Sequence, residues 1–493
     1  MSELNTVEAA PLDSARGKIR HEFDLDTEPA PPRETVWHAV REALRGSRRN
    51  YTEGPIGRAI LVLAIPMVLE MAMESIFVVC DVFFVAKLGA DAVATVGLTE
   101  SLMAIIYTLA MGLSIGVSAT VARRVGEKDA QGAARTAVQG IALGMVAAAA
   151  LGVIGAVFAP ELLRAMGASE SVVASGTGFT RVMLGGNASV LLLFLINGIF
   201  RGAGDAALAM RTLWLANAIN ILLGPCLIFG LGPFPQMGVV GAAIATTTGR
   251  GVGVLFAASQ LFRSGSRVHI TRDLVQLDGV LMTKLIRLSS TGTFQVLIAT
   301  ASWIGLVRLI ASFGSSALAG YTIAIRIVMF ALLPSWGLSN AAATMVGQSL
   351  GSNQPDRAEK AVWLAGKYNL FFLGAVGIVF VVFARSIVSV FTTDLSVAGY
   401  ATDGLRVIAA GFVMYAYGMV MANAFNGAGD TWTPTWLNLV CFWAWEIPLA
   451  YVLSSMVGMG PHGVFLSVPI AFSTFALLAM VMFKRGAWKT KRV

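Results

Sequence analysis

The sequence predicts an all-α integral membrane protein with twelve transmembrane helices. We expect two six-helix bundles related by a pseudo-two-fold axis along the membrane normal. First, the 493 residues are 56% hydrophobic and 13% charged, whereas soluble domains are roughly 25% charged. Second, apolar stretches long enough to cross a bilayer as helices recur along the chain. Third, residues 225 positions apart are repeatedly of the same kind.

The repeat is clearest in one motif. Arg201-Gly202-Ala203-Gly204-Asp205 recurs as Asn426-Gly427-Ala428-Gly429-Asp430, and 426 − 201 = 225. Matches in a single register, without drift, indicate a duplicated unit. The same interval separates Gly89 from Gly314, Gly126 from Gly351, Arg181 from Arg406, Gly238 from Gly463, and Phe158 from Phe383.

Each copy supplies six predicted spans, with boundaries uncertain by several residues. The first set lies at about 57–86, 92–122, 135–159, 172–200, 208–230 and 236–262. The second lies at about 283–311, 317–347, 360–389, 397–425, 432–455 and 460–484. Because six is even, both copies enter the membrane in the same direction, which predicts parallel repeats with a substrate path between them.

The predicted spans divide the chain into two lobes with polar segments around them. We expect a polar cytoplasmic tail (1–55), an N-terminal lobe (56–262), a cytoplasmic linker (263–282), a C-terminal lobe (283–485) and a basic tail (486–493). Lys and Arg gather in both tails and in the loops after even-numbered spans. The positive-inside rule therefore predicts cytoplasmic termini and a multi-pass plasma (inner) membrane protein. The residues around Trp37 have an amphipathic pattern. Two interpretations of this segment stay open: an interfacial helix on the lipid surface, or a solvated segment.

Several classes of function are disfavoured. No GxxxxGK[ST] loop occurs, so the transport work must draw on a gradient or on a partner. The cysteines and histidines show no disulfide, metal or catalytic spacing. We therefore expect no enzyme, no cofactor and no nucleic-acid partner. The expected protein is a monomer that contacts small organic substrates and the lipid bilayer.

The first span carries three acids on one helical stripe, Glu70, Glu74 and Asp81. Steps of four and seven residues return close to the same face at about 100° per residue. An ionisable residue at mid-membrane costs about 2.5–3.5 kcal/mol, so such a stripe usually faces a cavity or partners. Clustered carboxylates favour sharing a proton or a cation. Two interpretations stay open: ion coupling, or structural pairing across helices, for instance with Arg250.

Other residues of the first copy extend this candidate ion site. Pro66 interrupts the first span and predicts a bend, either as a moving gate or as a static feature. Glu100 lies at a depth comparable to that of Asp81. Oxygen ligands suit Na⁺ and carboxylates also suit protons, but an isolated amide or hydroxyl equally serves helix–helix contacts. The uncharged oxygen donors are Asn197, Asn220 and Thr246.

The second copy is poorer in acids. Glu446 is its clear mid-span acid, and Arg326 is expected at a similar depth, where it would neutralise Glu446. Gln295 stands where the first copy has Glu70, so we expect the coupling chemistry mainly in the first copy. Adaptable aromatic and Met-rich walls suit varied substrates, although ordinary packing is the alternative. The candidates for such a wall are Trp303, Met414 and Tyr415.

Over about residues 55–485, the chain resembles the multidrug and toxic compound extrusion (MATE) family of the MOP flippase superfamily. The motifs that carry the resemblance are Ala64-Ile65-Pro66-Met67, Asp81-Val82-Phe83-Phe84-Val85-Ala86, Arg124-Val125-Gly126-Glu127, Asn197-Gly198-Ile199-Phe200-Arg201-Gly202 and Ala341-Ala342-Ala343-Thr344-Met345-Val346-Gly347-Gln348. The resemblance implies two lobes that face each other across a cavity. It also implies export of organic, often cationic compounds in exchange for Na⁺ or H⁺. The family's bent first span and aspartate map onto Pro66 and Asp81, and its polar partners onto Asn220, Thr246 and Asn197.

One position departs from the family pattern and leaves the coupling ion open. Gly224 stands where one branch of the family carries a fifth-span acid. We hypothesise that Glu100 or Glu74 supplies a carboxylate beside Asp81 instead. The alternative function is a flippase for lipids or lipid-linked oligosaccharides, which needs a basic central cavity. Its candidate residues are Arg181, Arg250, Arg308, Arg326 and Arg406.

Overall fold

The structure is a computed structural model that describes residues 36–47 and 50–491. Most of the predicted polar tail, including residues 1–35, lies outside these ranges. Within them every regular element is helical, which confirms the all-α prediction. Eleven helices are long and apolar enough to cross a membrane, or up to twelve if one bent pair in the described chain counts as a span.

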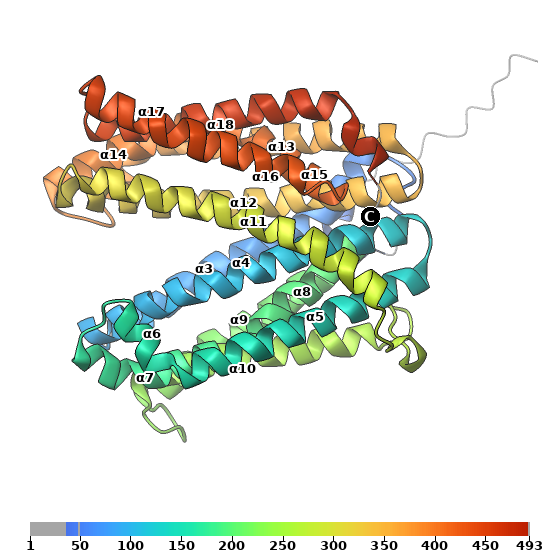
Figure 1. Cartoon of the computed structure of the whole chain (residues 1–493), viewed down its shortest axis with the longest axis horizontal. Coiled ribbons are helices and arrows are strands. Elements are labelled where there is room, and N and C mark those ends of the chain that lie inside the picture. The colour runs from blue at the N-terminus through green and yellow to red at the C-terminus, as the bar shows by residue number, and fades with distance from the viewer. Residues whose placement is uncertain (1–35, 48–49, 492–493) are drawn as a thin grey trace, which may run out of the picture.

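The first copy of the repeat forms the N-lobe, which is the lower bundle in Figure 1. Its fourth span is interrupted at Gly186, which ends one helix and precedes the next. A short helix, α6 (Ala159–Ala165), joins the third and fourth spans. The spans are α3 (Ile56–Ala86), α4 (Ala90–Gly126), α5 (Ala130–Val157), α7 (Glu170–Gly185) with α8 (Asn187–Ala203), α9 (Ala206–Phe229) and α10 (Gly238–Leu261).

The second copy forms the C-lobe, the upper bundle in Figure 1. Its fourth span is bent by 58° at Gly411, and 411 − 186 = 225, so the two interruptions match in the repeat. The fifth span contains π-helical segments. The elements are α11 (Gly279–Ala311), α12 (Ser315–Gly351), α13 (Pro355–Val388), α14 (Leu395–Ala410), α15 (Phe412–Gly427), α16 (Trp432–Asn438), η2 (Leu439–Glu446), α17 (Ile447–Tyr451), η3 (Val452–Met456) and α18 (Pro461–Lys484).

Side-chain contacts repeat together with the sequence. The Nε of Arg181 donates to the carbonyl of Ala156 at 3.0 Å. The Nε of Arg406 donates to the carbonyl of Val381 at 3.2 Å. Donor and acceptor are both displaced by 225 residues, so the duplicated sequence builds a duplicated structure.

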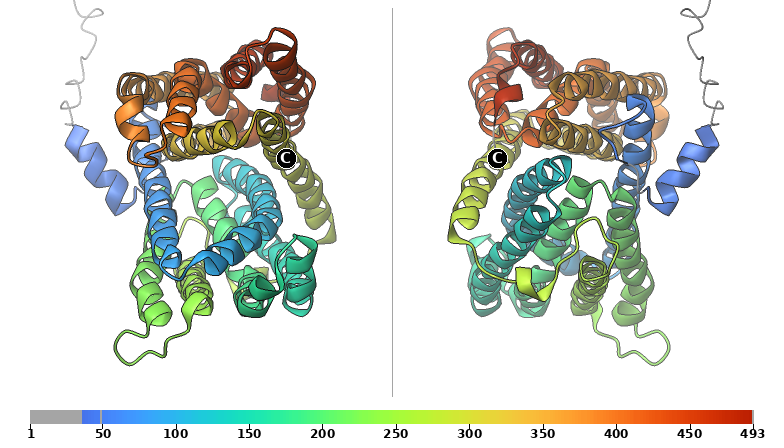
Figure 2. Two further views of the ribbon diagram at one scale, coloured as in Figure 1. Left: turned by 90° about the vertical axis from the view of Figure 1, so that its left-hand side faces the viewer. Right: turned by 90° about the vertical axis from the view of Figure 1, so that its right-hand side faces the viewer.

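The two lobes touch at one end of the molecule, here named the contact end, and diverge at the other, the splayed end (Figures 1 and 2). At the contact end, a Cβ on Gly126 would overlap the carbonyl of Gln348. A Cβ on Gly351 would overlap the carbonyl of Arg123. The two contacts are equivalent in the repeat, because 126 + 225 = 351 and 123 + 225 = 348. A two-fold axis between the lobes requires such an exchange.

The rest of the seam between the lobes also depends on small residues. Gly112 and Gly116 of α4 lie directly against Thr293 and Ser289 of α11. On the other side, Gly337 of α12 lies against the backbone of α3 at Met67, next to Pro66. Close backbone approach over small residues is the usual way helices associate in a membrane. The helix α3 itself runs without interruption through Pro66.

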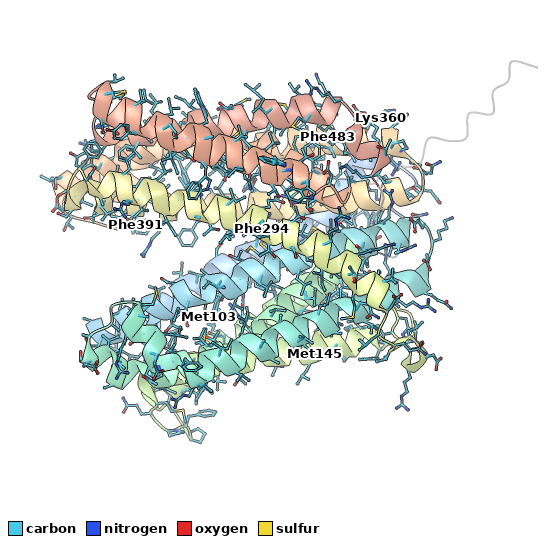
Figure 3. All side chains as sticks on the ribbon, viewed as in Figure 1. Met103, Met145, Phe294, Lys360, Phe391 and Phe483 are labelled. Atoms are coloured by element: carbon cyan, nitrogen blue, oxygen red, sulfur yellow. The ribbon has the colours of Figure 1, made fainter. Side chains whose placement is uncertain are left out.

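Large apolar side chains are exposed on both lobes. Met145 on α5 and Phe391 after α13, both labelled in Figure 3, are each 52% exposed. Such a surface is unfavourable in water and suits contact with lipid tails.

A segment before the first span lies across the contact end. The helix α2 (Val36–Arg45) packs against α3 and lies at the side of the molecule in Figure 2.

The residues after α2 contact both lobes. The hydroxyl of Tyr51 donates to the carbonyl of Gly204 in the N-lobe at 3.2 Å. Burial raises the pKa of Tyr51, so the hydroxyl keeps its proton for this bond. The guanidinium of Arg357, on α13 of the C-lobe, donates to the carbonyls of Tyr51 and Gly54 at 2.9 Å each. Residues 50–55 therefore tie the two lobes together, and we name them the strap.

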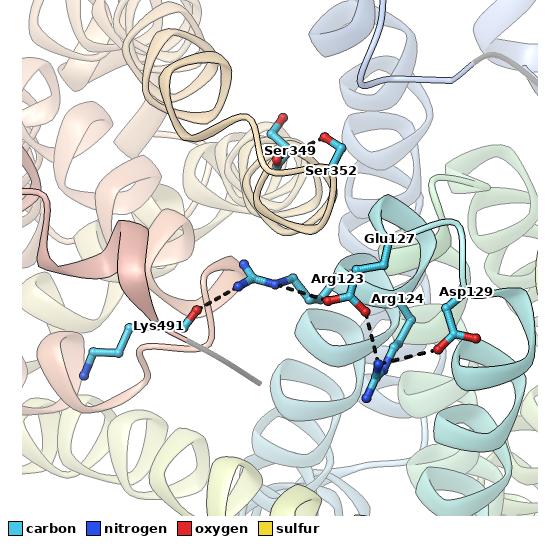
Figure 4. A network of polar contacts seen from close by, with 7 residues as sticks. All are labelled: Arg123, Arg124, Glu127, Asp129, Ser349, Ser352 and Lys491. Carbon is cyan, nitrogen blue, oxygen red and sulfur yellow. Dashed lines mark hydrogen bonds and ion pairs between the residues drawn. The ribbon is translucent and has the colours of Figure 1, made fainter.

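The chain's last described residues are docked as well. Trp488 is fully buried, stacks on Phe483 and donates its Nε1–H to the carbonyl of Phe483 at 2.9 Å. Arg123 of the N-lobe donates to the carbonyl of Lys491 at 2.8 Å, as Figure 4 shows. Arg123 also pairs with Glu127 at 3.7 Å. The segment predicted as a basic tail thus contains a second connection between the lobes.

Candidate functional site

The three acids of α3 have different surroundings, although they share a helical face. Glu70 is 1% exposed and lies 2.8 Å from the Nη1 of Arg201 on α8. The amide of Asn197, on the same helix, donates to the same oxygen at 3.2 Å. Glu70 is therefore held in an ion pair through Oε1, while its buried Oε2 has no hydrogen-bond partner among the described residues. Structural pairing accounts for this acid, with Arg201 as the partner rather than Arg250.

Glu74 belongs to a second buried network. Asn217 of α9 donates to its carboxylate at 3.0 Å, and Arg250 of α10 lies 3.5 Å away. Arg250 also donates to the hydroxyl of Tyr107 on α4 at 2.8 Å and lies over the ring of Phe77. This single guanidinium therefore connects three helices of the N-lobe. The predicted pairing with Arg250 thus applies to Glu74.

Asp81 differs from both of these acids. It lies five residues before the end of α3 at Ala86, is half-buried, and makes no hydrogen bond or ion pair with any described residue. The charged groups that act on it electrostatically are Glu100 and Arg250. Asp81 is thus the acid of the stripe that no described basic or amide group engages.

The predicted uncharged partners of Asp81 form a pair of their own. The amide of Asn220 on α9 donates to the hydroxyl of Thr246 on α10 at 2.7 Å, which leaves the amide oxygen of Asn220 as an acceptor. Gly224 lies one turn further along α9 and adds no side chain there. Asn197 is not part of this group, because it lies with Glu70 and Arg201 near the end of α8.

Glu100 on α4 is the second acid near Asp81. Arg326 of α12, in the other lobe, acts on Glu100 electrostatically, and both side chains are exposed. Glu100 and Glu74 were the two acids considered as replacements for an acid at Gly224. Glu100 acts electrostatically on Asp81, whereas Glu74 forms an ion pair with Arg250. The expected neutralisation of Glu446 by Arg326 is wrong, because Arg326 acts electrostatically on Glu100 and not on Glu446.

The remaining candidates of the second copy are dispersed within the C-lobe. The backbone carbonyl of Gln295 accepts a hydrogen bond from Asn438 at 3.0 Å. Tyr415 packs on Phe472 with ring centroids 4.2 Å apart, which is an interior contact. Trp303 and Met414 are half-buried. Their role in a substrate wall remains a prediction.

Sequence reasoning did not identify Tyr107 or Arg201 as partners of the acids. A tyrosine in the middle of a predicted span carries a hydroxyl that requires a partner, which was the available signal for Tyr107. The predicted fourth span ends at about residue 200, whereas α8 continues to Ala203 and places Arg201 inside the last turn of the helix.

Comparisons with known proteins agree with this architecture. The sequence model of the MatE family matches residues 66–226 and 293–452, once in each copy of the repeat. The chain belongs to the MatE family. This membership confirms the predicted fold and makes the chain a multi-pass membrane protein of a transporter family.

Individual relatives of this MatE chain cover nearly all of it. It is 24% identical over 442 residues to the probable multidrug resistance protein YoeA of Bacillus subtilis, with 89% of this chain and 95% of that protein covered. It is 27% identical over 426 residues to a protein named FAD transporter from Shewanella oneidensis, with 86% and 93% covered. A solved outward-facing conformation of a multidrug resistance MATE transporter of the MOP superfamily superposes with a TM-score of 0.83, 27% identity, and 89% and 98% coverage.

Proposed function

We propose that this MatE transporter is a secondary antiporter that exports small organic compounds in exchange for H⁺ or Na⁺. Its cargo would be cationic or amphipathic, and transport would proceed by alternating access between the lobes. The observation that carries the proposal is Asp81, a half-buried membrane acid with no hydrogen bond or ion pair to a described residue. An intramembrane acid in this condition is poised to take up a cation.

Arg250 supplies the link from ion binding to the packing of the N-lobe. It pairs with Glu74 and acts on Asp81, so one cation is shared by two carboxylates. A proton or Na⁺ on Asp81 cancels the attraction between Asp81 and Arg250. Arg250 then interacts only with Glu74 and Tyr107 among these groups. The ion then changes the relative free energies of two conformations only through its different affinity for each of them.

The orientation of the molecule follows from its charges. Basic residues such as Arg124, Arg272, Arg357 and Lys489 lie at the contact end or in the segments that join it. By the positive-inside rule this end is cytoplasmic. The lobes diverge at the opposite end, so the conformation is outward-facing, and Asp81 and Glu100 lie in the outer half. The predicted cytoplasmic position of both termini agrees with this proposed orientation.

The flippase alternative is less well supported. A pyrophosphate-binding cavity needs several guanidinium groups that converge, yet Arg181 and Arg406 each donate to a backbone carbonyl of their own lobe. Arg250 is engaged by Glu74 and Tyr107. These contacts favour export of organic solutes over flipping of lipid pyrophosphates.

The test is transport by the full chain in proteoliposomes, with sodium and pH gradients imposed separately. A fluorescent organic cation is the first cargo, and FAD is the second because one relative is named an FAD transporter. The proposal requires that either gradient drives uptake of the organic cation. Transport of FAD alone would overturn the cargo class, and transport that ignores both gradients would overturn antiport.

A further inference from the structure

The C-lobe contains a buried acid that the mechanism above does not use. Glu446 ends η2 in the eleventh span, and its side chain is 2% exposed. Among the residues that the structure describes, none forms a hydrogen bond or an ion pair with its carboxylate. The neighbouring Trp445 is 44% exposed, so the backbone turns this acid, and not the indole, toward the interior of the lobe.

The local backbone explains why the acid lies there. Pro448 lacks an N–H, and in a regular α-helix its ring would collide with the carbonyl of Ala444 four residues earlier. The segment from Leu439 to Glu446 is π-helical, which widens the turn at this point. Single π-helical turns within α-helices occur frequently at functional sites.

Two tyrosines on other helices lie within electrostatic reach of the acid. Glu446 acts electrostatically on Tyr321 of α12, Tyr415 of α15 and Cys441 of η2. Tyr321 is 1% exposed, and its hydroxyl also lacks a hydrogen-bond partner in the described part of the chain. Two unsatisfied polar groups from separate helices therefore share one buried region.

The basic side chains on the helices packed against η2 do not contact Glu446. The helices packed against η2 are α11, α16, α17 and α18, and of these α16 and α17 contain no basic residue. Arg308 of α11 is exposed. His462 of α18 contacts Asp403 at 3.1 Å, and both side chains are about half exposed. None of these groups compensates a negative charge on Glu446.

An ionised carboxylate without a partner is strongly unfavourable in such an interior. A proton on the carboxyl group removes the charge and with it this cost. Sodium, as a hard cation, needs several oxygen ligands, and no metal-binding cluster of acidic, His or Cys side chains exists in the described ranges. We propose that Glu446 is a proton-binding site of the C-lobe, loaded in this conformation and unloaded when the lobe rearranges during transport.

The site has no counterpart in the first copy. The matching position is Ile221, because 446 − 225 = 221. The two lobes would then titrate through different spans, by Asp81 in the first and by Glu446 in the eleventh. The role of this proton in transport rests on the proposed antiport, whereas proton binding itself does not.

The direct test is infrared difference spectroscopy of the full chain in lipid nanodiscs during a pH titration. Wild-type protein should show a band from a protonated carboxyl group that Glu446→Gln removes and Asp81→Asn leaves in place. Tyr321→Phe should shift the frequency of this band, because it removes a hydroxyl dipole on which Glu446 acts electrostatically. A spectrum unchanged by Glu446→Gln, or a band that responds to sodium and not to pH, would overturn the assignment.

A transport measurement separates this proposal from the proposed function. Glu446→Gln resembles the protonated acid in shape and charge, so it should fold, which the melting temperature in detergent checks. We expect the proton gradient to accelerate its transport less than that of the wild type, by roughly fivefold or more. If the wild type shows no gradient-driven transport but the band is lost in Glu446→Gln, antiport fails and the proton site stands. If antiport is present and the band persists, the proton site fails alone.

Discussion

Arg250 and Glu74 form an ion pair at 3.5 Å inside the N-lobe, and the same guanidinium acts on Asp81 further along α3. The side chains are 5% and 20% exposed, so the pair lies largely out of solvent. Because Arg250 also holds the hydroxyl of Tyr107, the charge state of Asp81 is connected to the packing of α3, α4 and α10.

Removing Arg250 should destabilise the protein because it leaves two carboxylates without their cation. Breaking a buried ion pair typically costs about 3–5 kcal/mol. We expect Arg250→Met to lower the free energy of unfolding by about 3 kcal/mol, since Glu74 keeps some exposure. Denaturant unfolding in detergent measures this. The double variant Glu74→Gln/Arg250→Met should recover part of the loss, and purely additive losses would contradict the pairing.

Glu70 should act on stability and not on ion dependence. Arg201 and Asn197 both hold its Oε1. Glu70→Gln should therefore cost about 3 kcal/mol of stability, while the response of transport to sodium and pH stays that of the wild type. Melting temperatures and gradient-driven uptake check the two parts. A well-folded Glu70→Gln that loses its ion dependence would return Glu70 to the coupling site.

The repeat made much of the fold predictable from the sequence. An interval of 225 residues predicted two parallel bundles, and the structure repeats individual contacts at that interval, as with Arg181 and Arg406. Apolar length predicted the spans because a bilayer imposes it. The interruption of the fourth span at Gly186 was not predicted, since composition and length do not reveal a break inside an apolar stretch.

The site was less predictable than the fold. Helical periodicity placed Glu70, Glu74 and Asp81 on one face, and all three do face the interior of the lobe. It could not show that Glu70 meets α8 and Glu74 meets α9 and α10, whereas Asp81 is not engaged by any described residue. The docking of Trp488 was missed as well, because a short basic segment gives no periodic signal.

The glycine contacts between the lobes should control the conformational equilibrium. In Gly126→Ala the new methyl group would overlap the carbonyl of Gln348, and overpacking typically costs about 1–3 kcal/mol. We expect a shift toward the conformation in which the contact end is open, measured as distances between spin labels on the two lobes. Gly374→Ala is the matched control, because nothing lies within 4 Å of its Cβ. Equal distance distributions in both variants would argue against the role of this contact.

The strap should loosen when its anchor on α13 is removed. Arg357 donates to several strap carbonyls, including that of Glu53 at 3.0 Å. A hydrogen bond to a charged group contributes about 1.5–3 kcal/mol, so Arg357→Ala should accelerate amide exchange in residues 50–55 by roughly tenfold or more. Hydrogen–deuterium exchange by mass spectrometry reports this, with Arg385→Ala on the same helix as the control. Unchanged exchange in the strap would show that Arg357 does not hold it.

The most direct test of ion coupling is gradient-driven uptake by Asp81→Asn in proteoliposomes. Asp91→Asn, an exposed acid in the first turn of α4, serves as the matched control. The proposed mechanism predicts that Asp81→Asn loses the acceleration by sodium and proton gradients while the control keeps it. Transport by Asp81→Asn at the wild-type rate under both gradients would contradict the assignment of Asp81 as the coupling site.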